Sequence, residues 1–331
     1  MNRRTSQARS HQSGLTLVEL MIAIALGLLV LLVATGLLLS VKAAYIAQDQ
    51  TEQIQETARY AAQILARAIR QAGYEYRDAE QPAFAADAEL SANVVGMDAM
   101  NLKKSGAALT SATTSEVVNG SDILALRFAG DDTGNGAEGT ILNCAGLSVP
   151  AAEEHDDPEQ ARGWSIFFVA KDSAGEPELR CKYQTKSGGW NADAIARGVE
   201  SFQVLYGVDT QDDGAPDRFL SADGIAGLDA GLTLSGNNAV ERLSDLQRKT
   251  HWKKVRAIRF ALLVRGGEAA RDDAMQDEYD LFGPAYSALH AHDDRGVHLT
   301  VAGMPPATRK RIRKLFSQTI QLRNDAAGSG A

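Results

Sequence analysis

Residues 11–41 read HQSGLTLVELMIAIALGLLVLLVATGLLLSV, an apolar run that follows a glycine and contains one acid, Glu19. From Leu20 to Val41 the run has no charged residue. A helix of this length spans roughly 33 Å at 1.5 Å per residue, which matches the hydrocarbon thickness of a bilayer. The sequence therefore predicts a transmembrane helix at about residues 20–41.

The charges before this helix predict its orientation. Arg3, Arg4 and Arg9 precede it, and no acid occurs before Glu19. Because cationic flanks stay on the cytoplasmic side, residues 1–14 are expected in the cytoplasm and the bulk of the chain in the periplasm. A secretory signal is disfavoured, since the apolar stretch exceeds 7–15 residues and no small-residue cleavage site follows it. A plain signal anchor that tethers an enzyme remains an alternative.

Glu19 is the first candidate functional residue. A carboxylate inside an apolar segment costs a few kcal/mol unless it is paired, although an acid at the interface can also reach water. Residues 14–19, GLTLVE, resemble the processing site of type IV prepilins. The resemblance implies cleavage between Gly14 and Leu15 by a prepilin peptidase, N-methylation of Leu15, and pairing of Glu19 with the new ammonium of a neighbouring subunit. Leu15 stands where phenylalanine or methionine is usual.

The helix is predicted to continue far beyond the membrane. Apolar residues recur at spacings of three and four through residues 54–72, no proline interrupts residues 15–73, and Gly73 is a natural stop. A helix over 15–72 would be roughly 87 Å long, too long for a compact globule. Its first half is expected in lipid or among partner helices, and its alanine-rich second half against a sheet. The apolar stripe comprises Ile54, Ala58, Ala61, Leu65, Ala68 and Ala72.

Residues 73–331 are expected to form the exported globular domain, and this length supports a real core. The formal net charge of the chain is −8, and loss of the three leader arginines would leave −11. Such a surface repels nucleic acid, so a DNA-uptake receptor is disfavoured and no nucleic-acid partner is expected.

Short β-branched or aromatic segments bounded by Gly, Asp or Pro predict strands after residue 121. Residues 164–171 and 179–184 are joined by a polar link, which favours an antiparallel hairpin. No alternation of strands and helices is visible. The expected fold class is α+β, with the long helix packed on an antiparallel sheet, whereas residues 73–120 read as loops with short helical turns. The expected strands are 123–128, 164–171, 179–184, 201–208, 255–265 and 319–323.

Two cysteines, Cys144 and Cys181, lie 37 positions apart in the part predicted to be exported. In an oxidising compartment such a pair usually forms a bridge. The alternative is two buried free thiols. Metal binding is disfavoured because neither cysteine has a second cysteine or a histidine at ligand spacing.

Residues 209–217, DTQDDGAPD, resemble the first nine positions of a calcium-binding loop. Oxygen-bearing side chains occupy positions one, three, five and nine, supplied by Asp209, Gln211, Asp213 and Asp217, and a glycine is sixth. Leu220 stands at position twelve, where a bidentate glutamate belongs. An acidic turn with no ion has the same composition. Calcium is therefore the one candidate cofactor, and none is required.

The sequence carries no catalytic signature. No Gly-x-Ser-x-Gly, His-Glu-x-x-His or phosphate-loop motif occurs. His290, His292, Asp293 and Asp294 crowd together, and a solvated loop is favoured there over a metal site. We therefore expect a protein that is not an enzyme.

Three segments of the second half are similar to the PilW-type minor pilins of type IV pili: VESFQVLYGVD at 199–209, Trp252 followed by VRAIRFALLVR at 255–265, and FSQTIQLRN at 316–324. The resemblance implies a pilin-like fold and a low-abundance subunit that joins other minor pilins in a tip complex priming pilus assembly. It implies contacts with the major pilin through the N-terminal helix, and with the prepilin peptidase and the inner-membrane assembly machinery.

The same resemblance implies two locations: the inner membrane before assembly and the cell-surface pilus afterwards. Two alternatives remain open. One is a large, tip-proximal pseudopilin of a type II secretion system, which shares the N-terminal features. The other is a membrane-anchored extracellular binding module or adhesin.

Overall fold

The computed structural model describes residues 14, 16–75, 90–131, 139–151, 157–270 and 278–324. The chain separates into two compact units, Met1–Asp49 and Gln50–Ala331. The helix α1 (Leu17–Gln71) contributes to both. The predicted helix over 15–72 is confirmed within one residue at its C-terminal end, while Leu15 lies outside the described residues.

The end of α1 is fixed by Gly73 and by the last described residue of the chain. Gly73 has φ +71°, and a Cβ there would lie 2.8 Å from the backbone oxygen of Asn324. The Asn324 amide donates to the backbone oxygens of Arg70 and Ala72 at 3.3 and 3.2 Å. These bonds satisfy helix carbonyls that have no partner within α1.

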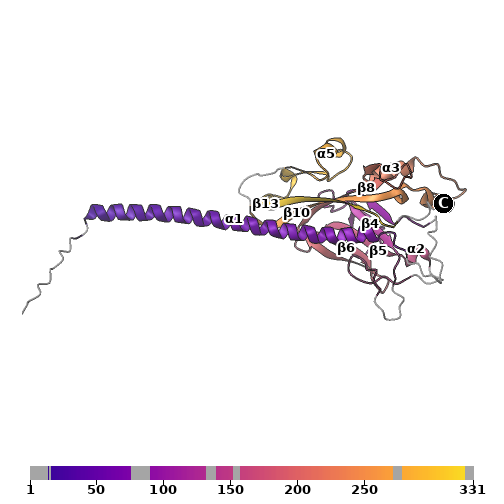
Figure 1. The fold of residues 1–331 in the computed structure, drawn as a ribbon, viewed down its shortest axis with the longest axis horizontal. Helices are drawn as coiled ribbons and strands as arrows, with labels where there is room; N and C mark the ends of the chain where they lie inside the picture. The colour runs from indigo at the N-terminus through magenta and orange to yellow at the C-terminus, as the bar shows by residue number, and fades with distance from the viewer. Residues whose placement is uncertain are drawn as a thin grey trace, which may run out of the picture. The chain divides into compact units, whose positions relative to one another are not determined.

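The C-terminal part of α1 packs through the predicted stripe, and each of its six members is buried. Alanines leave the helix backbone close to the strands that cover it. The helix begins its packing at Gln50, a buried residue whose Oε1 accepts from the backbone N–H of Glu268 at 3.1 Å. Figure 1 shows this part of α1 running beside β10 and β13.

The first sheet has five strands among the described residues, all antiparallel, in the order β1-β4-β5-β6-β7. Its strands are β1 (Val94–Met97), β4 (Ile123–Phe128), β5 (Gly163–Lys171), β6 (Pro177–Gln184) and β7 (Trp190–Arg197). The predicted hairpin is confirmed as β5 and β6, with Ile166 opposite Lys182.

The second sheet has four antiparallel strands within the described ranges, in the order β13-β10-β8-β9. The strand β10 is central, as its apolar run predicts. The strands are β8 (Val199–Val208), β9 (Arg218–Leu220), β10 (Val255–Ala269) and β13 (Arg311–Gln321).

The remaining elements are short and lie between or outside the two sheets. Two strand pairs, β2 with β3 and β11 with β12, form separate hairpin-like ladders. These elements are β2 (Asn101–Leu102), β3 (Ala112–Thr113), α2 (Pro158–Ala161), α3 (Ala222–Ala230), α4 (Ala239–Lys249), η1 (His251–Lys254), β11 (Glu278–Asp280), α5 (Pro284–His290), β12 (His298–Thr300), η2 (Val301–Gly303) and η3 (Pro306–Thr308).

The main core lies where α1 meets one face of each sheet. Leu65 of α1, Phe167 of the first sheet and Phe260 of the second belong to one buried cluster. The opposite face of the first sheet is covered by residues 97–112, and that of the second by residues 279–304. This arrangement confirms the α+β fold with a long helix on antiparallel sheets.

Three expectations about strands need correction. The predicted strand 319–323 begins eight residues earlier, at Arg311. The sequence hides this start because Arg311 and Arg313 read as solvated, whereas they bind Glu176 and Glu200. Residues 73–120 contain β1, β2 and β3 rather than loops alone. The strand β7 was also not expected, because its alternation is masked by small residues.

Ion pairs of arginines connect strands within the second sheet and link that sheet to the first. Glu200 of β8 binds Arg313 of β13 through two hydrogen bonds, at 2.6 and 3.1 Å. Glu176, in the turn between β5 and β6, contacts Arg265 of β10 and accepts from Arg311 at 2.8 Å. Each buried guanidinium therefore meets a carboxylate, which offsets part of the cost of burying both charges.

Candidate functional site

The N-terminal candidate site is centred on the first turn of α1. Gly14 and Glu19 are exposed, whereas Leu15 and the rest of the leader lie outside the described residues. The carboxylate of Glu19 accepts from the backbone N–H and the hydroxyl of Thr16, both at 2.9 Å. The Glu19 N–H donates in return to the Thr16 hydroxyl at 3.3 Å.

These reciprocal bonds form a capping box. The first N–H groups of a helix have no partner within it, and the Thr16 and Glu19 side chains satisfy two of them. Glu19 therefore has a local role that reasoning about charge in the membrane missed. The signal was visible in the sequence, because Thr16-Leu17-Val18-Glu19 fits the pattern of a threonine followed three residues later by glutamate.

Two of the three bonds of this box end on the same oxygen of Glu19, Oε2, and the third is donated by the Glu19 backbone N–H. The second carboxylate oxygen projects from an exposed side chain at the start of the apolar helix. Glu19 can thus cap its own helix and accept from a cation of another molecule at the same time.

Beyond this turn, residues 20–41 of α1 are uncharged and exposed. Among the described residues, α1 is the one helix that is long and apolar enough to cross a membrane. Leu26 and Leu32 keep 60% and 74% of their surface in this isolated chain. Exposed apolar surface of this kind needs an apolar partner, and the described residues do not cover it.

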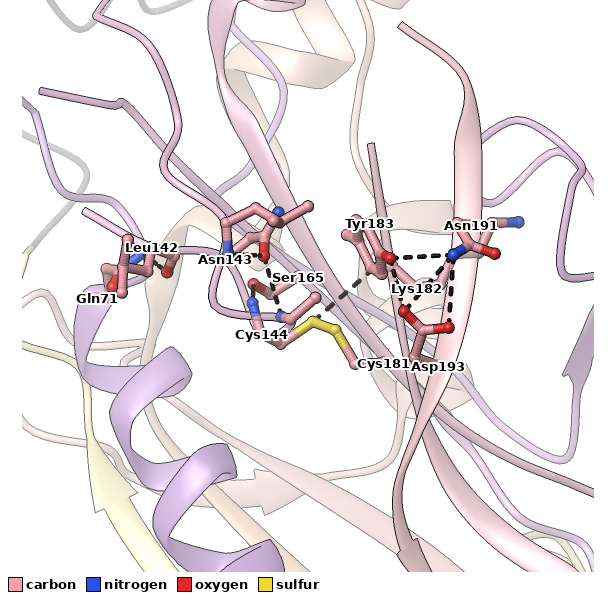
Figure 2. The surroundings of a disulfide bond; sticks show 12 residues. Gln71, Leu142, Asn143, Cys144, Ser165, Cys181, Lys182, Tyr183, Asn191 and Asp193 are labelled. Atoms are coloured by element: carbon pink, nitrogen blue, oxygen red, sulfur yellow. Dashed lines mark hydrogen bonds between the residues drawn. A yellow bond between two sulfur atoms is a disulfide. The ribbon is translucent and has the colours of Figure 1, made fainter. Parts of the chain in front are cut away.

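The two predicted cysteines are joined in the structure. Cys144, in the segment 139–151, is bonded to Cys181 of β6, with Cα atoms 5.9 Å apart. Figure 2 shows the backbone N–H of Cys144 donating to the Ser165 hydroxyl, a bond of 2.9 Å. The amide of Gln71, the last residue of α1, donates to the Leu142 oxygen at 2.9 Å. The disulfide thus fixes a segment that also touches the end of α1.

The predicted calcium loop is closed by its own hydrogen bonds. The Asp209 carboxylate is buried and accepts from the N–H groups of Gly214 and Asp213, at 2.9 and 3.2 Å. Its Oδ2 also lies 3.2 Å from Nε of Arg256. Burial acts to raise the pKa of Asp209, but these donors outweigh it, so the pKa is lowered.

The other predicted ligands of this loop point to local partners. The Asp217 carboxylate accepts from the N–H and hydroxyl of Thr210, at 2.6 and 2.7 Å. Asp213 accepts from the N–H of Ala215 at 3.0 Å. Within the described part of the chain no three acidic, histidine or cysteine side chains are grouped as a metal site. Calcium binding at this loop stays a prediction.

The cluster around His290 is only partly the solvated loop that its sequence suggests. His292 and Asp293 are exposed and lie 2.9 Å apart. Asp294 is buried, and one of its oxygens accepts from the Tyr286 hydroxyl at 2.9 Å. Burial, and next the charge of Asp98, raise the pKa of Asp294 to about 7. The solvated reading is therefore wrong for Asp294, because the 291–297 turn folds it inward.

Asp294 belongs to a group of buried acids that the sequence did not reveal. Asp122 accepts from the N–H groups of Ala99 and Val204, at 3.0 and 2.8 Å. Burial, followed by the charges of Asp98 and Asp294, raises the pKa of Asp122 despite these bonds. Asp98, Asp122 and Asp294 come from separate loops, so their spacing along the chain did not indicate that they lie near one another.

The comparisons with known proteins follow this geometry. Residues 166–324 match the family model described as Type IV Pilus-assembly protein W, a stretch that runs from β5 to the end of β13. Residues 9–35 match the Prokaryotic N-terminal methylation motif, which includes Gly14, Thr16 and Glu19. No curated protein and no solved structure matches the chain significantly. The chain therefore carries a prepilin-like N-terminal motif ahead of a region that is similar to type IV pilus-assembly protein W.

Proposed function

We propose that this protein is a minor pilin that helps to prime assembly of a type IV pilus, in a tip complex with other minor pilins. The observation that carries the proposal is the exposed apolar part of α1 directly after Gly14 and Glu19. Such a surface fits lipid before assembly and the helices of other subunits after it. The family matches support pilus membership at the coarser level.

Processing would create the assembly-competent form. Cleavage between Gly14 and Leu15 leaves an α-ammonium at Leu15, which N-methylation keeps cationic. Glu19 of one subunit then faces the ammonium of its neighbour through the oxygen that the capping box does not use. A register error leaves both charges unpaired among apolar helices, so the pair sets the axial stagger of the subunits.

The proposal includes a location and a set of partners. The arginines of the leader hold it in the cytoplasm, so the C-terminal unit lies in the periplasm before assembly and on the cell surface afterwards. The partners are the major pilin, other minor pilins, the prepilin peptidase and the inner-membrane assembly machinery. The role is structural rather than enzymatic, and the net charge of −8 disfavours nucleic acid.

Processing is tested by Gly14→Val, with Gly36→Val as a matched control in the same helix. A Cβ on either glycine meets no atom within 4 Å in the isolated chain, so neither change strains the fold. We expect mass spectrometry to find Gly14→Val uncleaved and Gly36→Val starting at Leu15. A Gly14→Val protein that still starts at Leu15 would overturn the cleavage assignment.

The priming role is tested by deleting the gene and counting surface pili. We expect few or no pili, restored by the wild-type gene but not by the Gly14→Val gene. Normal pili with a loss of protein secretion would instead identify a type II secretion pseudopilin. Normal pili with a loss of surface attachment would identify an anchored adhesin, and either result would refute priming.

A further inference from the structure

The strand β13 lies at the edge of the second sheet. Among the described residues it pairs with β10 and with no other strand. At eleven residues it is long for an edge strand, and the unpaired backbone groups of such an edge can accept a further strand. Its residues Leu315, Ser317, Gln318 and Thr319 are exposed.

Two hydrogen bonds show which backbone groups face this free edge. The N–H of Leu322 donates to the Arg256 oxygen at 2.9 Å, and the N–H of Ala270 donates to the Lys310 oxygen at 3.1 Å. Antiparallel strands alternate between residues that bond inward and residues that bond outward. Even-numbered residues of β13 therefore bond to β10. The outward N–H and C=O groups belong to Arg313, Leu315, Ser317 and Thr319.

A groove follows this edge. Its volume is about 930 Å³, and β13 and α1 form its two sides. On the side of α1 the groove is lined by the small side chains of Ala58 and Ala62, which leave space in it. On the side of β13 it is lined by Phe316 and Gln318. The groove thus gives an added strand room for the side chains on its helix-facing side.

The groove is cationic in an acidic protein. Arg59 of α1 and Lys314 of β13 line it from opposite sides. Neither forms an ion pair with a described carboxylate, unlike Arg311 and Arg313 in the same strand. Residues 308–324 contain six cationic side chains and no acid, against a chain net charge of −8. Charge complementarity therefore selects an acidic occupant.

A second copy of the same edge is a poor occupant. Two β13 strands side by side would bring Lys314 and its neighbouring cations together, and like charges across a ladder destabilise it. A lysine on an edge strand also opposes pairing of that edge with itself. An acidic strand converts the same charge into an attraction.

We propose that β13 and the adjoining groove bind an extended acidic segment of another polypeptide, which adds to the sheet as a strand. Its backbone bonds to the outward groups of residues 313–319. Its carboxylates face Arg59 and Lys314 across the groove. In such strand addition the main chain supplies affinity and the flanking side chains supply selectivity. This surface is separate from the apolar part of α1, so the inference does not depend on the proposed pilus role.

The test uses the full chain in detergent micelles and fluorescent peptides of about seven residues. One peptide alternates glutamate with valine, a second alternates lysine with valine, and a third is the glutamate peptide N-methylated on the edge that would face β13. We expect anisotropy to show binding of the first peptide at low salt. Binding should be at least about tenfold weaker for each of the other two.

Variants of the protein locate the binding site. Ser317→Pro removes an outward N–H and leaves the bonds to β10 in place. It should therefore weaken binding of the glutamate peptide at least about tenfold, whereas Ser317→Ala should leave this binding unchanged. The double variant Arg59→Glu with Lys314→Glu should no longer bind the glutamate peptide and should bind the lysine peptide instead.

Two results would overturn the proposal. The first is no binding of the glutamate peptide. The second is equal binding of the N-methylated and unmodified peptides, since this would show a charge contact without strand addition. The N-methylated peptide acts on the unaltered protein, so this comparison holds even if Ser317→Pro fails to fold.

Discussion

The two parts of α1 belong to one continuous helix but bury opposite amounts of surface. Residues 20–41 have no charged residue on any side of the helix and are exposed, with Leu31 keeping 61% of its surface. Residues 50–71 are apolar along one stripe and polar elsewhere, and Leu65 keeps none of its surface. The stripe meets two sheets of the same chain, whereas the apolar part needs a partner outside it.

The difference shows where each part obtains its stabilising interactions. Hydrophobic burial along the stripe contributes to folding of the C-terminal unit. Burial of residues 17–41 contributes to insertion and association, because these residues are exposed in the described part of the chain. Substitutions in the two parts should therefore separate folding from assembly.

The largest expected effect is on Glu19. Glu19→Gln keeps the capping box, since glutamine can fill the same position, but removes the charge. A neighbour's buried ammonium would lose its counter-charge, which costs on the order of 3–5 kcal/mol per broken pair. We expect processed Glu19→Gln protein to accumulate in the inner membrane and to be absent from sheared pili.

Thr16→Ala provides the matched control for Glu19. It removes the capping hydroxyl and keeps the carboxylate, at a cost of about 1 kcal/mol in helix stability. We expect this variant to enter pili in reduced but measurable amounts. Normal incorporation of Glu19→Gln would show that the apolar contacts alone set the stagger.

The second prediction compares the two parts of α1 by making the same change, leucine to alanine, in each part. Leu65→Ala should lower the free energy of unfolding of the C-terminal unit by about 2–5 kcal/mol, since it opens a cavity in the core. Leu31→Ala should leave that free energy unchanged. Chemical denaturation of both variants in the same detergent gives the measurement. Equal destabilisation would mean that residues 17–41 also take part in folding.

The third prediction concerns the covalent link of the C-terminal unit. Closing 37 residues contributes roughly 3–4 kcal/mol in the chain-entropy description. The double variant Cys144→Ser with Cys181→Ser should therefore be cut faster by protease than the wild type. Alkylation under denaturing conditions checks the starting state. Two freely alkylated cysteines in periplasmic protein would contradict the disulfide.

A second contrast exists between two sets of charged residues within the C-terminal unit, one of arginine–glutamate pairs and one of aspartates. Arg265 and Arg313 each meet Glu176 or Glu200, so the charges there are balanced. Burial raises the pKa of Asp98, Asp122 and Asp294, and the charge of Asp98 raises the pKa of the other two further. The charges of the first group compensate one another at neutral pH, whereas ionisation of the second group destabilises the fold.

This contrast predicts a pH dependence. The folded pKa of Asp294 is about 7, above the unfolded value near 3.9, so the folded state binds the extra proton. Stability should therefore rise as pH falls from 8 through 7 towards 5. Acids with lowered pKa, such as Asp217 and Glu159, should reverse the trend below about pH 4.

Asp294→Asn should raise the melting temperature at pH 8 and flatten the rise between pH 8 and 5. The acid costs on the order of a few kcal/mol at pH 8, at 1.4 kcal/mol per unit of pKa. Asp293→Asn is the matched control, because that neighbour is exposed. A wild-type protein equally stable at pH 8 and 5 would contradict a raised pKa of Asp294.

The smallest expected effect concerns calcium at residues 209–217. An ion held by Asp209, Gln211, Asp213 and Asp217 would stabilise the fold by about 0.4 kcal/mol when its concentration equals the Kd. The test is a rise in melting temperature with millimolar calcium that Asp213→Ala abolishes and that magnesium reproduces only weakly. No shift would assign the loop to a turn held by its own hydrogen bonds.

Local sequence patterns predicted the elements whose pattern extends over many residues. The stripe from Ile54 to Ala72, the stop at Gly73 and the hairpin of β5 and β6 all agree with the structure. Short elements without periodicity were missed, among them β1 and β3. The start of β13 was missed because its arginines gain their carboxylate partners only when distant strands meet.

The sequence by itself determined that this chain has a prepilin-like N-terminus, an apolar span and a long helix that stops before Gly73. Those features depend on residue order over a few helical turns, so local physics is enough to read them. The tertiary structure alone decided that Asp98, Asp122 and Asp294 share one buried region, and that Arg59 and Lys314 line one groove. Such groups are set by contacts between residues far apart in the chain, which no local pattern encodes.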